Sequence, residues 1–197
     1  MDFALLGWPP DAPTLRLDYR RFAYAGKFVR GSTGKAVIRE GERGENEYDD
    51  HLLAAASFDT DRTDPDRLVV RYVTVRDDRQ GEGLGARLLA FVAAHAADRG
   101  YDRVRIAVNN PAAYVAAHRA GFAFTGAETG VAELVCERPA VRPAAVDADA
   151  YRTGLDRYRD RDLDAEALAH LDEKAATGPP SVVEVPEGAG PDAEPGG

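Results

Sequence analysis

The chain has 197 residues, enough to bury a sizeable core in one domain with an extension or in two very small domains. Its formal net charge of -9 disfavours nonspecific binding to nucleic acid, and its single cysteine, Cys136, rules out an intramolecular disulfide. We find no CxxC or HExxH motif, no basic and apolar leader, and no apolar run of about 18 residues, and we therefore expect no metal site and a soluble, cytoplasmic protein.

The charged residues are unevenly distributed among the amino-acid types. Only three of the 25 basic residues are lysines, at positions 27, 35 and 174, against 34 acidic residues. A surface rich in carboxylates stays hydrated in strong salt, so this composition is typical of proteins from a salt-loaded cytoplasm. A GC-rich genome, which favours Ala, Arg, Gly, Asp and Pro, is the alternative explanation.

The first part of the chain consists of strand-like segments joined by polar loops. The first segment alternates loosely between apolar and polar residues, whereas a later one is a short apolar run. In chain order we expect a strand and its continuation at 13–30, a short strand at 35–40, a charged turn at 41–50, a strand at 52–60 and a hairpin loop at 61–67.

The middle of the chain alternates strands with helices. Residues 68–75 are mostly β-branched and form the strongest predicted strand. The strongest predicted helix, 84–99, has apolar residues at helical spacing and ends at Gly100. After it we expect a strand at 103–109, a helix from Pro111 to about residue 120, and a strand pair at 122–126 and 132–138. This order predicts an α/β domain with a mixed sheet over residues 1–139.

Residues 140–197 are predicted to form an extension of this domain. An alanine- and proline-rich linker comes first, and a polar helix is expected at about 151–175. The tail is rich in glycine and proline, so most of it is expected to be disordered, with residues 181–185 as a docking strand. We interpret the extension as an arm for self-association or for a partner.

A glycine-rich turn, QGEGLG at residues 80–85, lies between the strongest strand and the strongest helix. The free N–H groups and the dipole of a helix N-terminus attract phosphate, and glycine lets the backbone approach it closely. Arg79 and Arg87 could add charge-assisted hydrogen bonds. The alternative is a purely structural turn, which needs one glycine rather than three.

Two other phosphate-binding motifs fit the sequence less well. The fragment GSTGKA, residues 31–36, lacks the hydroxyl residue that follows the lysine of a Walker A loop. A dinucleotide fingerprint would run from Gly81 to Ala86, but it should open an early βαβ unit. Here it falls in mid-chain, and the next strand ends in two asparagines instead of an acidic residue.

Two motifs together resemble those of a known enzyme superfamily. Residues 80–85 match the pattern Q/R-x-x-G-x-G/A, and about 25 residues later Asn110, Ala113, Gly121 and Phe122 match Asn, two residues, Ala, then a helix ending in Gly-Phe. These motifs resemble the GNAT superfamily of acetyl-CoA-dependent N-acetyltransferases, over roughly residues 13–138. The resemblance implies a mixed, mostly antiparallel sheet that is splayed at the cofactor slot and flanked by helices.

The resemblance also implies which residues bind acetyl-CoA. The backbone of the strand before the loop would pair with the pantetheine arm, and the loop would hold the pyrophosphate. Asn110 would contact the cofactor, although a helix N-cap ahead of Pro111 explains this residue equally well, and both roles can coexist. The implied cofactor-binding residues are Val73, Val75, Gln80, Gly81, Glu82, Gly83, Leu84, Gly85, Ala86 and Asn110.

The residue that protonates the leaving thiolate departs from the family pattern. Many members have a tyrosine four residues before the glycine of the Gly-Phe pair, and this position is Ala117 here. His118 and Tyr114 share a helix face, so we predict that one of them is the general acid, His118 before Tyr114. The alternative is that His118 is a solvated surface residue and no side-chain acid is used. The base that deprotonates the amine could be Asp59 or Glu133 acting through water. A base could also be unnecessary if the substrate amine has a low pKa.

These observations predict an N-acetyltransferase that transfers an acetyl group from acetyl-CoA to an amine of a small molecule or a protein. A non-catalytic module that binds acyl-CoA or a protein partner is the alternative, and the missing tyrosine favours it. We expect no nucleic-acid or membrane partner and leave a homodimer open. Cys136 is interpreted as a buried strand residue instead of a nucleophile.

Overall fold

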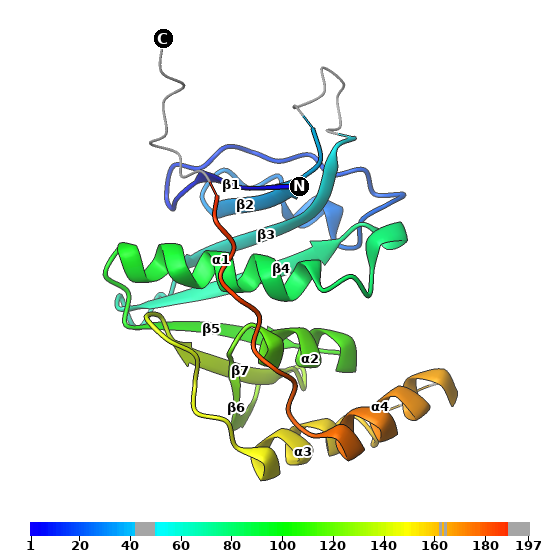
Figure 1. Cartoon of the computed structure of the whole chain (residues 1–197). Helices are drawn as coiled ribbons and strands as arrows, with labels where there is room; N and C mark the ends of the chain where they lie inside the picture. Colours follow the sequence, from blue (N-terminus) through cyan, green and yellow to red (C-terminus); the bar gives the residue numbers. More distant parts are fainter. Residues whose placement is uncertain (42–49, 162, 164, 189–197) are drawn as a thin grey trace.

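A computed structural model of the chain describes residues 1–41, 50–161, 163 and 165–188. Its centre is one mixed sheet with the strand order β1-β2-β3-β4-β5-β7-β6 (Figure 1). Only β4 and β5 pair in parallel, and the other neighbours are antiparallel. The strands are β1 (Asp2–Gly7), β2 (Gly34–Arg39), β3 (Leu52–Thr60), β4 (Arg67–Val75), β5 (Arg103–Val108), β6 (Ala123–Glu128) and β7 (Leu134–Pro139).

The sheet is buried on both faces over its central strands. In β2, Ala36 and Ile38 join the larger core cluster, whereas Val37 joins a smaller cluster on the opposite face with Phe22 and Phe28. Helix α1 (Leu84–Asp98) packs on the first face, and the segment between β1 and β2 covers the second (Figure 1). This double burial explains why β3 begins with five apolar residues and why β2 has three consecutive apolar residues at 36–38.

The sheet opens between β4 and β5. Their register runs from Arg67 opposite Arg103 to Val70 opposite Ile106 and ends there, although β4 continues to Val75 and β5 to Val108. The last residues of β4 therefore pair with β3 alone. The mixed, mostly antiparallel sheet that opens beside β4 confirms the expected fold class, and the predicted strand 68–75 and helix 84–99 are both confirmed.

The predicted strand at 13–30 is wrong, and β1 was not foreseen. Asp18 accepts hydrogen bonds from the backbone N–H and the guanidinium of Arg20, and its carbonyl closes a turn with Arg21 and Phe22. This turn breaks the extended chain, and a short 3-10 helix follows at Ala25–Lys27. The aromatic residues of the segment cover a sheet face instead of pairing with a strand.

The single helix expected at about 151–175 is also wrong, because the structure has two helices there, α3 (Ala148–Asp156) and α4 (Ala165–Thr177). The connection between them is tied to the end of β5. The Tyr158 hydroxyl donates to the carbonyl of Val108 over 3.1 Å, and Arg161 donates to the carbonyl of Asn109 over 2.7 Å. These bonds fix residues 158–161 beside the end of β5. One continuous helix would have directed the chain away from this point.

Residues 148–188, which we call the C-terminal arm, pack against the first 139 residues. Tyr151, Leu155 and Tyr158 are almost fully buried in the larger core cluster. After α4 the chain runs back across α1 toward β1 (Figure 1). Residues 181–185 do not form a strand, although Val183 donates one backbone bond to Arg119. The domain boundary near residue 139 stays a prediction, and residues 42–49 and 189–197, part of the predicted turn and tail, lie outside the described residues.

Candidate functional site

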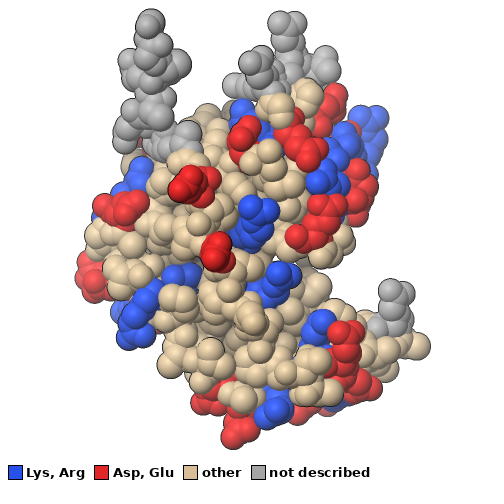
Figure 2. Space-filling model, viewed as in Figure 1, with Lys and Arg blue, Asp and Glu red and all other residues tan. Residues whose placement is uncertain are grey.

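A cavity of about 790 Å³ lies where β4 and β5 separate. Its walls are the end of β4, the turn before α1, one face of α2 (Pro111–Arg119), and α4 with the residues that follow it. Figure 2 shows a hollow between the part of the surface over β4 and α1 and the part over α4, with basic atoms at its inner end.

The predicted phosphate loop lines this cavity. Gly83, in the left-handed region at φ 79°, is the N-cap of α1, and no side chain caps the helix. The first N–H groups of α1 are therefore left for a ligand. Gly85 lies beside the valines of β4: a Cβ there would make ordinary contacts, 3.6 Å from the side chain of Val75 and 3.9 Å from that of Val73.

Most of the implied cofactor-binding residues are brought together here. Val73, Val75, Gln80, Gly81, Gly83, Leu84, Gly85, Ala86 and Asn110 all line the cavity. Glu82 does not line it, and its carboxylate accepts a 2.7 Å bond from Arg79. Asn110 is also the N-cap of α2, because its side chain accepts the N–H of Ala113 over 2.8 Å. The structure thus shows the capping role, while contact with a cofactor stays a prediction.

Arginines on two sides reach the phosphate loop, and the sequence reasoning identified only one of them. Arg79 lines the cavity but is held by Glu82 and Glu40. Arg87 instead lies over the ring of Phe3. The overlooked residue is Arg119, whose guanidinium nitrogens would stand 3.1 and 3.3 Å from a Cβ at Gly83.

Helical spacing was the signal for Arg119. Residues 112, 116 and 119 fall on one face of α2 because they are four and then three positions apart. Two alanines on this face leave room beside the helix, and the arginine one turn later reaches across to the start of α1. The sequence alone could not show that this face turns toward the glycine loop.

The charge of the cavity is opposite to that of the whole protein. Among the described residues, no Asp or Glu lines it, whereas Arg79, Arg119 and Lys174 do. The chain has 34 acidic residues and a net charge of -9, so the exclusion of carboxylates from a cavity this large is notable. A basic cavity at a helix N-terminus suits an anion that carries several phosphate charges.

The two predicted general acids, His118 and Tyr114, do not line this cavity. Tyr114 is fully buried, and its hydroxyl donates to the carbonyl of Tyr151 over 3.1 Å. Burial raises the pKa of Tyr114 far above its usual value. The tyrosine therefore belongs to the junction between α2 and the C-terminal arm.

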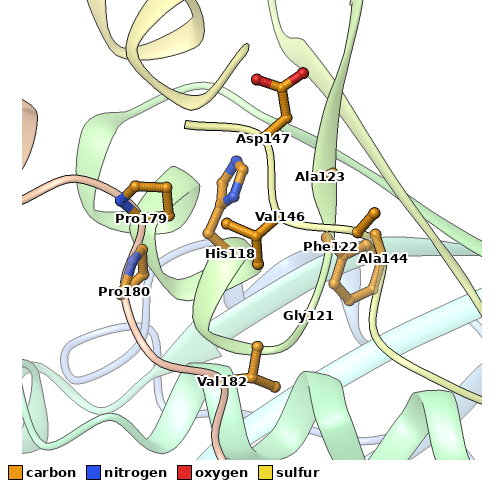
Figure 3. Close-up of a pocket in the computed structure, with 11 residues that line it drawn as sticks. His118, Gly121, Phe122, Ala123, Ala144, Val146, Asp147, Pro179, Pro180 and Val182 are labelled. Atoms are coloured by element: carbon orange, nitrogen blue, oxygen red, sulfur yellow. The ribbon is translucent and has the colours of Figure 1, made fainter. Parts of the chain in front are cut away.

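His118 lies in the same junction, 9% exposed, with its ring centroid 4.5 Å from that of Tyr114 and 4.7 Å from that of Tyr151. Its ring stands beside Pro179, Pro180 and Val146 at a small cavity of about 20 Å³ (Figure 3). Burial lowers the pKa of His118 to about 4. The assignment of the general acid to either residue stays a prediction, but their positions indicate packing, and His118 is not the solvated residue of the alternative.

Tyr24 is the phenol that does line the cavity. It is 51% exposed, its backbone is left-handed at φ 58°, and its hydroxyl accepts a 3.3 Å bond from the Asn109 amide. A residue other than glycine in this conformation is uncommon and is found more often at functional sites. No motif marked Tyr24 as a proton donor, because a loop brings it to the cavity from far along the chain.

Several other residues considered from the sequence do not line the cavity, and the role of Asp59 or Glu133 as a base acting through water stays a prediction. Asp59 and Glu133 do not line the cavity; the first lies 3.9 Å from Arg71, and the second accepts a bond from Thr129. Cys136 is buried, as expected, and burial raises its pKa to about 12. The Lys35 ammonium is buried and donates to Arg30 and Thr33, so it is not placed as the lysine of a phosphate loop. No helix among the described residues is long and apolar enough to cross a membrane.

Several solved acetyltransferase structures are similar to this chain. An N-acetyltransferase from Staphylococcus aureus is 19% identical and aligns with a TM-score of 0.44 over 55% of this chain and 68% of its own. A putative acetyltransferase from Salmonella typhimurium, solved with acetyl-CoA, is 21% identical with a TM-score of 0.44 over 59% and 69%. The ribosomal-protein-S18-alanine N-acetyltransferase from Escherichia coli is 18% identical with a TM-score of 0.41 over 58% and 72%.

The search of curated proteins found no match. The model of the acetyltransferase (GNAT) family, however, matches residues 9–122, a span that includes the glycine loop, the end of β4 and both motifs of the sequence analysis. Since this match covers more than half of the chain, the protein belongs to the GNAT acetyltransferase family.

Proposed function

We propose that the protein is an N-acetyltransferase that transfers the acetyl group of acetyl-CoA to an amine of a small molecule or of a protein. The observation that carries the proposal is a cavity that opens between two strands, begins at an uncapped helix N-terminus and contains basic but no acidic residues among those described. The acceptor amine is the unknown part of the reaction.

The lining residues suit the charge and the polar groups of acetyl-CoA. The first N–H groups of α1 and the guanidinium of Arg119 suit the pyrophosphate. The end of β4 around Val73 and Val75, which has no β5 partner, offers backbone groups to the amide-containing pantetheine arm. Asn110 stands at the β5 side of the opening, at the start of α2.

Bound acetyl-CoA supplies a thioester, whose carbonyl carbon accepts a neutral amine. The chain would stabilise the developing oxyanion with a backbone N–H group of β4. Among the described residues that line the cavity, Tyr24 is the side chain best suited to give a proton to the departing sulfur, because it is a phenol. Since no carboxylate lines the cavity among the residues that the structure describes, the amine is expected to lose its proton to water.

A non-catalytic module that binds acyl-CoA is the second candidate. It is favoured by Ala117, which stands where many family members have a tyrosine and which is fully buried here. The cavity also lacks a carboxylate base among the described residues. Such a module would bind the cofactor at the same site without transferring the acyl group.

Two measurements separate the candidates. Calorimetric titration of acetyl-CoA in molar KCl tests the cofactor site, and we expect a dissociation constant in the micromolar range. Release of free CoA is then followed with a panel of small amines and peptides. Binding without amine-dependent release would support the non-catalytic module, and absence of binding to a folded sample would overturn both candidates.

A further inference from the structure

One wall of the cavity comes from the C-terminal arm, beyond the segment that matches the family model. His170, Lys174 and Thr177 of α4 line it, followed by residues 178–181. The three side chains are four and then three positions apart, so they form one stripe on the helix. This stripe faces the same cavity as the arginine-bearing face of α2.

The core holds this wall in place. Tyr151, Leu155 and Tyr158 of the arm, and Leu171 of α4 itself, are each at most 1% exposed. Removing such large side chains from water stabilises the docked position of the arm. The backbone bond from Val183 to the carbonyl of Arg119 fixes the chain after α4 directly to the end of α2.

Two basic side chains occupy different walls of the cavity. Arg119 lies beside Gly83 at the phosphate loop, whereas Lys174 comes from the arm. The Lys174 ammonium is 2.9 Å from the carboxylate of Glu173, whose side chain is 62% exposed. An exposed ion pair of this kind adds little stability, so a more highly charged anion in the cavity can replace Glu173 as the partner of Lys174.

We propose that the arm binds a second phosphate group of the cofactor, separate from the pyrophosphate. The ligand is the 3′-phosphate on the ribose of CoA, a phosphomonoester with a charge of about -1.5 to -2 at neutral pH. Lys174 supplies the cation, and His170 stands on the same stripe to donate a hydrogen bond. The Thr177 hydroxyl donates to the carbonyl of Glu173 over 3.0 Å and is not counted as a donor to the phosphate. The inference rests on the proposed use of acetyl-CoA and adds that the arm selects the phosphorylated nucleotide.

The test compares CoA with dephospho-CoA, which lacks only the 3′-phosphate, by calorimetric titration. The wild-type chain should bind CoA at least about tenfold more tightly, equivalent to about 1.4 kcal/mol. The Lys174→Gln variant should lose most of this preference and keep the wild-type affinity for dephospho-CoA. Arg142→Gln removes the same charge from an exposed residue that does not line the cavity, and it should behave as the wild type.

The outcomes distinguish this inference from the proposed function. Equal wild-type affinities for the two ligands would overturn the role of the arm and leave the cofactor site intact. A Lys174→Gln variant that still prefers CoA by the wild-type factor would also overturn it. Absence of binding by either ligand to a folded sample would refute the cofactor site and the arm together. Circular dichroism spectra of both variants show whether they fold.

Discussion

Replacement of Gly83 by alanine, compared with the same change at a control glycine, separates the conformational role of the residue from its role in cofactor binding. Gly83 has φ 79°, and an L-residue in this left-handed region costs roughly 1–2 kcal/mol. For a chain of this length the loss corresponds to a fall in Tm of about 2–8 °C. Gly100 is the matched control, with φ 80° and no atom within 4 Å of an added Cβ. We expect both variants to lose similar stability.

The two variants should differ in cofactor binding. At Gly83 the new methyl group would stand 3.1 Å from Nη1 of Arg119, at the helix N-terminus where the pyrophosphate is expected. We expect Gly83→Ala to weaken CoA binding at least about tenfold, or about 1.4 kcal/mol, while Gly100→Ala binds as the wild type does.

Calorimetry with CoA and thermal unfolding of both variants provide the comparison. Wild-type affinity in a folded Gly83→Ala variant would refute the reasoning that places a phosphate on this loop. Equal loss of affinity in Gly83→Ala and Gly100→Ala would show that the effect comes from lower stability alone. The result would then give no support to phosphate binding by the loop.

Three further predictions concern the acid, the arm and pH. Tyr24→Phe should lower kcat by about 10²–10⁴-fold with little change in KM for acetyl-CoA. The control Tyr19→Phe, at a 75% exposed residue, should leave kcat unchanged. A Tyr24→Phe variant with the wild-type kcat would remove Tyr24 from the mechanism. Gly154→Ala in α3 should lower the free energy of unfolding in urea by about 1–3 kcal/mol, because the added methyl would overlap the side chain of Tyr114. A rise of about 1 kcal/mol, as helix propensity alone predicts, would show that the arm is loosely docked. The pKa of His118 is ordinarily 6.5 and falls to about 4 in the folded protein, so between these pH values only the unfolded chain binds the proton. The free energy of unfolding of the wild type should therefore fall by about 2 kcal/mol more than that of His118→Gln from pH 7 to pH 5. Parallel profiles of stability against pH for the two proteins would contradict this.

The sequence was sufficient for the segments whose pattern is local. The β-branched run 68–75, the helix that ends before Gly100 and the Asn-Pro start of α2 specify their own structure, because propensity and capping act within a few residues. The wrong prediction at 13–30 has a physical cause. The segment 13–30 has apolar residues that cover a sheet face from a loop, and periodicity cannot distinguish that from pairing.

For the site, the sequence by itself located the glycine turn at the start of α1, because glycines at a strand-to-helix turn leave free N–H groups wherever they occur. The tertiary structure alone decided which side chains surround the loop. Packing buried Tyr114 and His118 against the arm, brought Tyr24 in from an N-terminal loop, and turned Arg119 and Lys174 toward one cavity. These residues lie up to 150 positions apart, from Tyr24 to Lys174, and only the burial of a shared core brings such distant segments together.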